Sequence, residues 1–267
     1  MSVRLGVLSD LHCELDPTGS RWINVFEPER LDERLDEALG WFGEAEVDLV
    51  LLLGDVIQFA NLPDAEHALA RVAAAAVAPV ATVGGNHDLR LGDDFAACAR
   101  ASGIRLLDAE PLLLEGVALT GVGVGRGAAP PQYVGALAAA DADAPFVVVA
   151  SHFPLLSAAG RLAAVGLPYP GDLVNRAELE TQLADDRRPA VGLSGHIHAR
   201  TSATAGGLLQ LTVGALIEPP FDATIVEIDG GTVARTARRL GPLAETDPVF
   251  TADDERWRWV GDQWEAV

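Results

Sequence analysis

Short apolar segments alternate with amphipathic segments along most of the chain, and turn residues separate them. Continuous apolar runs of about four to eight residues predict buried strands, whereas apolar positions three and four apart predict helices. Buried strands are expected at residues 3–9, 47–53, 79–83, 146–150 and 191–194. Helices are expected at residues 29–42, 65–77, 93–101 and 175–185. Strands that alternate with helices in this way indicate an α/β fold.

The remaining β segments are shorter. They are expected near residues 104–107, 111–114, 117–122, 208–213, 223–228 and 232–238. Gly230-Gly231 lies between the last two and predicts a hairpin. We expect a main domain at residues 1–240 and a Trp-rich C-terminal tail at 241–267 that packs back on it. Residues 155–172 are rich in Ala, Gly and Pro and predict a long loop, which in a compact domain is often functional.

Metal-ligating side chains stand at the end of each strand predicted to be buried. They are Asp10 and His12, Asp55, Asn86 and His87, His152, and His196 and His198. On an extended segment residues i and i+2 project to the same side, so two of these sets form matched pairs. Five of the six histidines lie at such ends, which a random scatter does not explain. Ligands bind beyond the carboxyl ends of strands in α/β sheets, so this pattern favours a metal site.

Composition and charge exclude several other classes. The formal net charge of −20 argues against nucleic acid and anionic membranes as partners, because both require a basic surface. No apolar run approaches the roughly 18 residues of a membrane span, and no signal-peptide pattern opens the chain. Two cysteines do not make a disulfide framework, so a cytoplasmic location is expected. Cys13 is typical of a small buried residue, and a structural zinc site built mostly from Cys does not fit.

The order of motifs resembles the calcineurin-like metallophosphoesterase superfamily. The motifs are Asp10-x-His12, Gly54-Asp55, Gly85-Asn86-His87-Asp88, His152 and Gly195-His196-x-His198. The resemblance implies a four-layer α/β/β/α sandwich of two mixed β-sheets flanked by helices. It also implies two divalent metal ions: one held by Asp10, His12 and His198, the other by Asn86, His152 and His196, with Asp55 bridging both. His87 would face the phosphate and leaving group, oriented by Asp88.

This ligand set suits the hydrolysis of phosphate esters. Two cations about 3.5–4 Å apart clamp a phosphoryl group and lower the pKa of a bridging water, whose hydroxide attacks. Neutral His and Asn ligands leave the site net positive, so it holds an anionic substrate that the acidic protein as a whole repels. The resemblance thus implies a small-molecule phosphate mono- or diester as substrate, and the sequence leaves both open. Mixed O and N ligands accept Mn, Fe, Zn or Co.

Some positions depart from particular branches of the superfamily. Gln58 stands where purple acid phosphatases place a Tyr ligand, so that subgroup is not expected. His87 stands where the lipid A-pathway pyrophosphohydrolases show Arg, so that branch is not expected. The double-strand-break nucleases of the superfamily carry an added DNA-binding domain, and no segment of this chain is basic enough for one. Two alternatives are a non-catalytic metal-binding scaffold on the same fold and a dinuclear hydrolase of an amide bond. The complete ligand set disfavours the first, and the motif containing the non-ligand His87 disfavours the second.

Substrate contacts are expected from the loop at 155–172. This loop follows His152 directly, so it must leave from the rim of the site. Arg161 and Tyr169 are its side chains able to donate to a phosphate or stack on a ring, and we expect them to contact substrate. Trp22 and Phe26, in a loop at residues 14–28, either pack on the core or line a pocket. Residues 121–127 are Gly-rich but lack the Gly-Lys-Ser/Thr ending of a phosphate loop.

Overall fold

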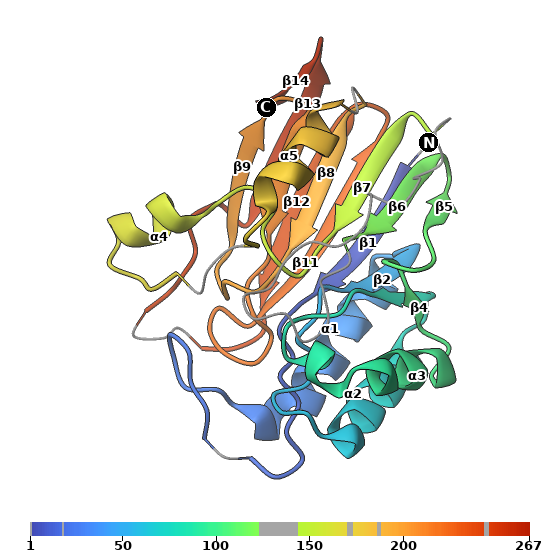
Figure 1. The fold of residues 1–267 in the computed structure, drawn as a ribbon, viewed down its shortest axis with the longest axis vertical. Coiled ribbons are helices and arrows are strands. Elements are labelled where there is room, and N and C mark those ends of the chain that lie inside the picture. The colour runs from blue at the N-terminus through green and yellow to red at the C-terminus, as the bar shows by residue number, and fades with distance from the viewer. Residues whose placement is uncertain (1, 18, 123–143, 170–172, 186–187, 243–245) are drawn as a thin grey trace.

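Two β-sheets packed face to face form the centre of the protein (Figure 1). The computed structural model describes residues 2–17, 19–122, 144–169, 173–185, 188–242 and 246–267. The first sheet contains β1 (Ser2–Leu8), β2 (Leu49–Leu52), β3 (Val80–Thr82), β4 (Arg105–Leu106), β11 (Asp222–Asp229), β12 (Thr232–Arg239), β13 (Asp254–Val260) and β14 (Gln263–Ala266). The second contains β5 (Leu112–Leu114), β6 (Val117–Gly121), β7 (Phe146–Ala150), β8 (Ala190–Ser194), β9 (Thr201–Ala205) and β10 (Leu208–Thr212).

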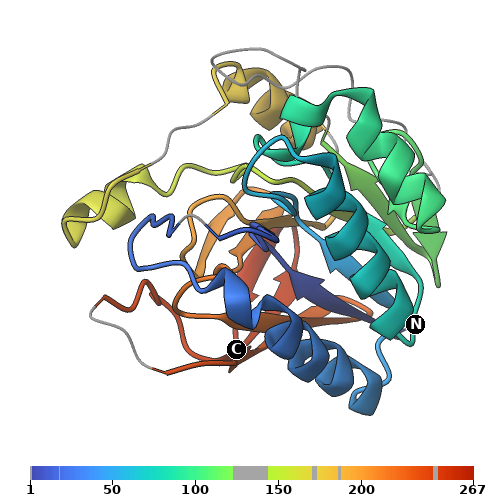
Figure 2. The ribbon, with the colours of Figure 1, turned by 90° about the horizontal axis from the view of Figure 1, so that it is seen from below.

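Helices flank the two sheets. They are α1 (Leu31–Glu44), α2 (Leu62–Ala75), α3 (Asp93–Ala101), α4 (Ala159–Ala164) and α5 (Arg176–Asp185), with 3-10 turns η1 (Pro28–Arg30) and η2 (Asp88–Leu91). Helices α1, α2 and α3 lie together on the outer side of the first sheet (Figure 2). Leu179 of α5 packs on the outer side of the second sheet, against Val147 and Val149 of β7. The predicted four-layer sandwich of two mixed sheets is therefore confirmed.

Strand order places the ends of the central strands together. In the described residues the first sheet runs β14-β13-β12-β11-β1-β2-β3-β4 and the second β5-β6-β7-β8-β10-β9. Strands β1, β2 and β3 are parallel neighbours, and so are β7 and β8. Parallel strands end at the same edge of their sheet, so the loops that follow these five strands start from two adjacent edges.

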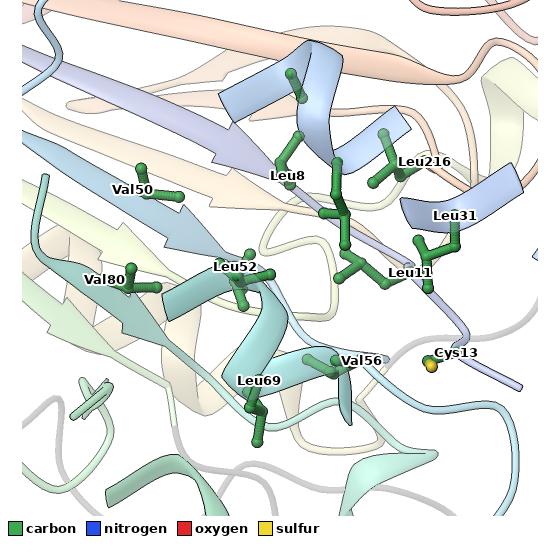
Figure 3. Packing of buried hydrophobic residues seen from close by; sticks show 14 of the residues in the cluster. Leu8, Leu11, Cys13, Leu31, Val50, Leu52, Val56, Leu69, Val80 and Leu216 are labelled. Atoms are coloured by element: carbon green, nitrogen blue, oxygen red, sulfur yellow. The ribbon is translucent and has the colours of Figure 1, made fainter. Parts of the chain in front are cut away.

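Alternation of side chains along the strands builds two apolar layers. Val3, Leu5 and Val7 of β1 face the second sheet and join the core between the sheets. The opposite face carries Leu8 of β1 and Leu52 of β2, which pack against the helices (Figure 3). Because successive strand residues point to opposite faces, one continuous apolar run supplies both layers. This explains why the buried strands read as uninterrupted apolar segments.

The C-terminal segment belongs to the first sheet. Strand β13 pairs antiparallel with β12, and β14 with β13, so the sheet extends beyond residue 240. Trp257 and Trp264 are buried in the core between the sheets. Their side chains alternate with charged residues, so this segment has no apolar run by which the sequence would predict strands. The tail thus supplies both strands and core.

Other expectations need adjustment. The segment 155–172 contains the short helix α4, so it is not simply a loop. Strand β9 was missed because its sequence, TSATA, has no apolar run. The predicted hairpin at Gly230-Gly231 joins β11 to β12. The Gly-rich run at 121–127 lies largely outside the described residues. None of the helices in the described ranges has the length and apolar character that a membrane crossing requires.

Candidate metal centre

The loops after five strands bring the predicted metal ligands together. They are Asp10 and His12 after β1, Asp55 after β2, Asn86 after β3, His152 after β7, and His196 and His198 after β8. Backbone hydrogen bonds join the loops to one another. The amide of His12 donates to the carbonyl of Asp55 at 2.9 Å, and that of Gly195 to the carbonyl of His152 at 3.0 Å. The second of these bonds connects loops from β7 and β8, so the ligands have fixed relative positions.

Asp10, His12 and His198 form the first group of candidate ligands. Nε2 of His198 lies 3.3 Å from Oδ1 of Asp10 and 3.1 Å from Nε2 of His12. Nε2 of His12 lies 3.7 Å from the same Asp10 oxygen. All three side chains are buried. Three ligand atoms that face one another at these distances can hold a single cation.

The second group contains Asn86, His152 and His196. Nε2 of His152 lies 3.1 Å from Oδ1 of Asn86 and 3.2 Å from Nδ1 of His196. Oδ2 of Asp55 is 3.2 Å from the same His152 nitrogen and 3.8 Å from Nε2 of His12. The Asp55 carboxylate therefore faces both groups.

Hydrogen bonds on the far side of two rings direct their lone pairs inward. Nδ1 of His198 lies 2.7 Å from Oε1 of Glu218, and Nδ1 of His152 lies 2.8 Å from the carbonyl of Leu53. Both partners are acceptors, so both rings donate from Nδ1 and keep a lone pair on Nε2. Oδ1 of Asp10, buried among them, has no hydrogen-bond partner among the described residues. Lone pairs and carboxylate oxygens repel unless a cation lies between them, so these residues fit bound metal ions.

The surrounding carboxylates also attract positive charge to the site. Burial by itself lowers the pKa of His198, but the carboxylates of Asp10 and Glu218 outweigh burial and raise this pKa to about 10. Asp55 similarly outweighs burial at His152 and raises its pKa to about 9. Metal binding requires the deprotonated rings, so protons and metal ions compete for these nitrogens.

Five candidate ligands have left-handed backbone conformations. Their φ angles are 54° for Asp10, 42° for His12, 48° for Asp55, 69° for His196 and 46° for His198. Residues other than glycine rarely adopt such angles, at a cost of about 1–2 kcal/mol each. Strain of this kind persists only where the surrounding structure imposes it, and it clusters at functional sites.

Two motif glycines make room for the carboxylates. A Cβ atom at Gly85 would overlap the carboxylate and backbone of Asp55, and one at Gly195 would overlap the hydroxyl of Ser9 and approach Asp10. Any larger residue would displace a candidate ligand. The glycines in these motifs are therefore required by close approach of the loops.

His87 lies beside the ligands, held by a different bond from the one expected. Its Nδ1 donates to the backbone carbonyl of Gln58, and its Nε2 lies 3.9 Å from Oδ2 of Asp55. Burial lowers the pKa of His87, and the nearby Asp55 carboxylate only partly opposes this. His87, His12 and Asp55 also form a group that can hold a cation, so geometry alone does not separate His87 from the ligands.

Asp88 does not orient His87, and that part of the prediction is wrong. Its carboxylate accepts backbone N–H groups from Gly85 at 2.9 Å, Val56 at 2.9 Å and Ile57 at 3.2 Å. Asp88 therefore joins the loop after β3 to the loop after β2. Burial raises its pKa to about 8, reinforced by the negative charge of Asp55. Its role is to hold the two loops that carry Asn86 and Asp55.

A cavity of about 300 Å³ opens over the two groups. The residues that line it are His12, Arg21, Trp22, Phe26, Asp55, Gln58, Asn86, His87, His196 and His198. The volume is at the lower end of the range for small-molecule sites. Arg21 is the only Arg or Lys among the described lining residues. Its Nη2 donates to the carbonyl of Ile23 at 3.2 Å.

Comparison with known proteins identifies the family. A family model described as calcineurin-like phosphoesterase matches residues 3–200, which contain every motif listed above. The chain belongs to the calcineurin-like phosphoesterase family. No curated protein sequence matches the chain.

Solved structures of calcineurin-like fold resemble this chain at low sequence identity. A dimetal phosphatase from Danio rerio has a TM-score of 0.66 and 16% identity, covering 89% of this chain and 96% of its own. A purple acid phosphatase from yellow lupin gives 0.58 and 15%, covering 93% and 54%. GAP50, the anchor in the inner membrane complex of Plasmodium, gives 0.55 and 10%, covering 93% and 91%. At these identities the likeness shows the shared fold.

Gln58 stands where the resemblance implies a tyrosine ligand in purple acid phosphatases. Its side chain lines the cavity, and its buried Oε1 has no hydrogen-bond partner in the described ranges. Tyr169 packs near Leu162, Ile197 and Ala199, while Tyr133 lies outside the described residues. We expect the iron-loaded protein to show no visible tyrosinate-to-iron charge-transfer band. Absorption spectra of the oxidised protein test this, and a strong tyrosinate band would contradict it.

The structure does not place the two predicted substrate residues at the cavity. Arg161, on α4, donates to the hydroxyl of Thr201. Tyr169 packs against a small apolar cluster that includes Leu162 and Ile197. Neither is among the residues that line the cavity. Following His152 in sequence fixes only where the segment starts: Arg161 then lies on α4, and Tyr169 lies beyond the end of that helix.

Sequence reasoning missed Arg21 and Glu218. Arg21 lies in the loop that also carries Trp22 and Phe26, and both aromatic residues line the cavity as well as packing on the core. The ring of Phe26 lies 5.2 Å from that of His12, centroid to centroid. No motif marked Arg21, which stands between Ser20 and Trp22. Glu218 is far from every motif in sequence, and only its contact with His198 reveals it.

Proposed function

We propose that this protein is a dinuclear metal-dependent phosphoesterase that hydrolyses a phosphate mono- or diester. The observation that carries the proposal is the Asp55 carboxylate, which faces two separate groups of inward-directed ligands. Asp10, His12 and His198 would hold one metal ion, and Asn86, His152 and His196 the other. Two divalent ions held there would polarise a phosphoryl oxygen and supply the activated water. The carboxylates of Asp10 and Asp55 only partly neutralise the charge of two divalent cations, so the site with both metal ions bound would attract a phosphate.

The residues around the ligands would position the substrate and its leaving group. His87 is held at Nδ1 by the carbonyl of Gln58, which leaves Nε2 free to exchange a proton in the cavity. We assign it proton donation to the leaving-group oxygen. The protonated ring would donate from Nε2. The cavity volume of about 300 Å³ favours a small-molecule substrate.

Arg21 is proposed to bind a non-reacting oxygen of the substrate phosphate. Hydrogen bonds to charged groups contribute about 1.5–3 kcal/mol, so Arg21→Ala should raise KM by roughly 10- to 100-fold. Arg161→Ala is the matched control, because its guanidinium binds Thr201 away from the cavity. Steady-state kinetics on the best substrate measure both variants. A larger effect of Arg161→Ala would return the substrate contact to α4.

Hydrolysis itself is tested with a panel of phosphate esters. Protein loaded with Mn²⁺ is assayed against aryl and alkyl monoesters and diesters, with the metal content measured on the same sample. We expect metal-dependent release of alcohol or phosphate from at least one class, and the relative rates assign monoester or diester specificity. Protein that carries two Mn²⁺ ions and hydrolyses nothing in the panel would contradict the proposal and favour a metal-binding scaffold.

A further inference from the structure

Glu218 is a fully buried carboxylate to which the proposed mechanism gives no role. It lies between β10 and β11, in a segment tied to the end of β1. Within this segment the amide of Leu216 donates to the carbonyl of Ser9 at 3.0 Å, and that of Phe221 donates to the carbonyl of Glu218 at 2.8 Å. The backbone of Glu218 is therefore fixed next to the loop that carries Asp10.

One oxygen of Glu218 orients a candidate metal ligand. Oε1 lies 2.7 Å from Nδ1 of His198, and a carboxylate can only accept there. The ring consequently donates from Nδ1 and turns the lone pair of Nε2 toward Asp10, 3.3 Å away. Replacing such a carboxylate partner typically costs about 10- to 100-fold in metal affinity.

The other oxygen of Glu218 holds a wall of the cavity. Residues 20–26 form a tight turn, here called the pocket-wall hairpin, closed by a bridge between Arg21 and Val25. Oε2 of Glu218 accepts the amide hydrogen of Asn24 at 2.7 Å, and Oε1 lies 3.5 Å from the amide nitrogen of Ile23. These two residues form the tip of the hairpin, so the Glu218 carboxylate binds the backbone at its turn.

The hairpin held in this way carries side chains that line the cavity. They include Arg21 and Trp22. The ring of Trp22 also lies 6.4 Å from that of His198, centroid to centroid. Losing the bond to Asn24 would therefore remove one of the contacts that hold the hairpin, leaving the bond from Nδ2 of Asn24 to the carbonyl of Thr246 at 2.9 Å.

We infer that Glu218 is a positioning residue that couples metal binding at His198 to the position of the pocket-wall hairpin. The inference rests on the proposed function, because it requires a metal ion at His198. A cation bound at Nε2 fixes the ring with its Nδ1 hydrogen toward Glu218, which holds the carboxylate in the orientation that also binds Asn24. The coupling is reciprocal: a fixed hairpin keeps Glu218 on His198 and so favours metal binding.

Glu218→Gln separates the two functions of the carboxylate with little change of shape. His198 and Asn24 meet different oxygens of the carboxylate. A glutamine has an oxygen in only one of these two places, so in this geometry it can accept from His198 or from Asn24. Its NH₂ group then faces the other donor, or it donates to Nδ1 of His198 and shifts the ring proton to Nε2, where it blocks the metal. Mn²⁺ affinity, measured by calorimetry, should fall by about 10- to 100-fold.

Hydrogen exchange followed by mass spectrometry reads the coupling without any enzymatic assay. In the wild-type protein, saturating Mn²⁺ should slow amide exchange in peptides that cover residues 20–26. In Glu218→Gln, saturating Mn²⁺ should leave exchange in that segment unchanged. Asp64→Asn is the matched control: Asp64 is a buried carboxylate that accepts the amide hydrogen of Leu15 in the same loop at 3.1 Å. That variant should keep both the metal affinity and the slowed exchange of the hairpin.

The outcomes separate this inference from the proposed function. Wild-type protein that binds no Mn²⁺ would overturn both. Wild-type protein that binds Mn²⁺ without slowed exchange in residues 20–26 would overturn the coupling alone, whether or not the variant folds. Retained affinity together with slowed exchange in Glu218→Gln would also overturn it.

Discussion

Replacing Asp55 by Asn is expected to remove most bound metal and to lower kcat/KM by about 10³-fold or more. The proposed activity depends on both cations, whose charge stabilisation is worth several kcal/mol, and each 1.36 kcal/mol changes a rate tenfold. Asp55 is the candidate ligand whose carboxylate faces both groups. The asparagine keeps the shape of the side chain. Its carbonyl oxygen can still accept from the backbone N–H of His87, whose nitrogen lies 2.8 Å from Oδ1 of Asp55 in the wild-type protein. Metal analysis of the desalted protein, with steady-state kinetics, measures the effect.

The matched control lies at the opposite end of the same strand. Asp48→Asn removes a carboxylate that accepts the amide hydrogen of Arg4 at 2.8 Å, just before β2. It should keep the wild-type metal content and activity. Full metal content and wild-type activity in Asp55→Asn would refute the assignment of Asp55 as the bridging ligand.

Replacing His87 by Asn should leave both metals in place and slow the hydrolysis of alkyl esters by about 10²–10⁴-fold, the usual contribution of a general acid. An activated aryl phosphate ester should be affected much less, because its leaving group departs without a proton. The amide nitrogen of the asparagine can still donate to the carbonyl of Gln58, so the turn keeps its hydrogen bond. Rates for the two ester types, measured on the same protein preparation, provide the comparison.

His67→Asn is the control for this experiment. His67 lies on α2, where its Nε2 is 3.3 Å from Oδ1 of Asp32 at the surface, and its replacement should change neither rate. Equal losses on alkyl and aryl esters in His87→Asn would favour binding of the phosphate over proton donation. Loss of a metal ion would instead make His87 a ligand, in line with its grouping with His12 and Asp55.

Much of the fold and most of the site could be predicted from the sequence, because the relevant signals are local. An apolar run that ends in Asp, His or Asn marks both a buried strand and the residue that leaves it at the carboxyl end. Five strands repeat this pattern, with ligand pairs such as Asp10 with His12. Parallel neighbours end at one edge, so strand order brings together the ends of β1, β2 and β3 in one sheet and those of β7 and β8 in the other. The order of the motifs indicated the family, and membership of that family implied two sheets.

Only the tertiary structure decided which groups surround the ligands. Asp88 follows His87 directly, yet its carboxylate binds the backbone of Val56 and Ile57, because η2 turns it toward the loop after β2. Arg161 lies nine residues after His152, yet α4 directs it to Thr201.

The contacts of Glu218 also could not be predicted from the sequence. Asn24 is 194 residues from Glu218 in sequence, and their 2.7 Å hydrogen bond exists because the segment after β10 crosses to the loop after β1. The strands β13 and β14 likewise could not be predicted, since Trp257 and Trp264 are buried in the core only because β13 pairs with β12. The hydrophobicity of consecutive residues predicts whether a strand is buried. Contacts between distant segments depend on how the sheets and loops pack, and no short stretch of sequence contains that information.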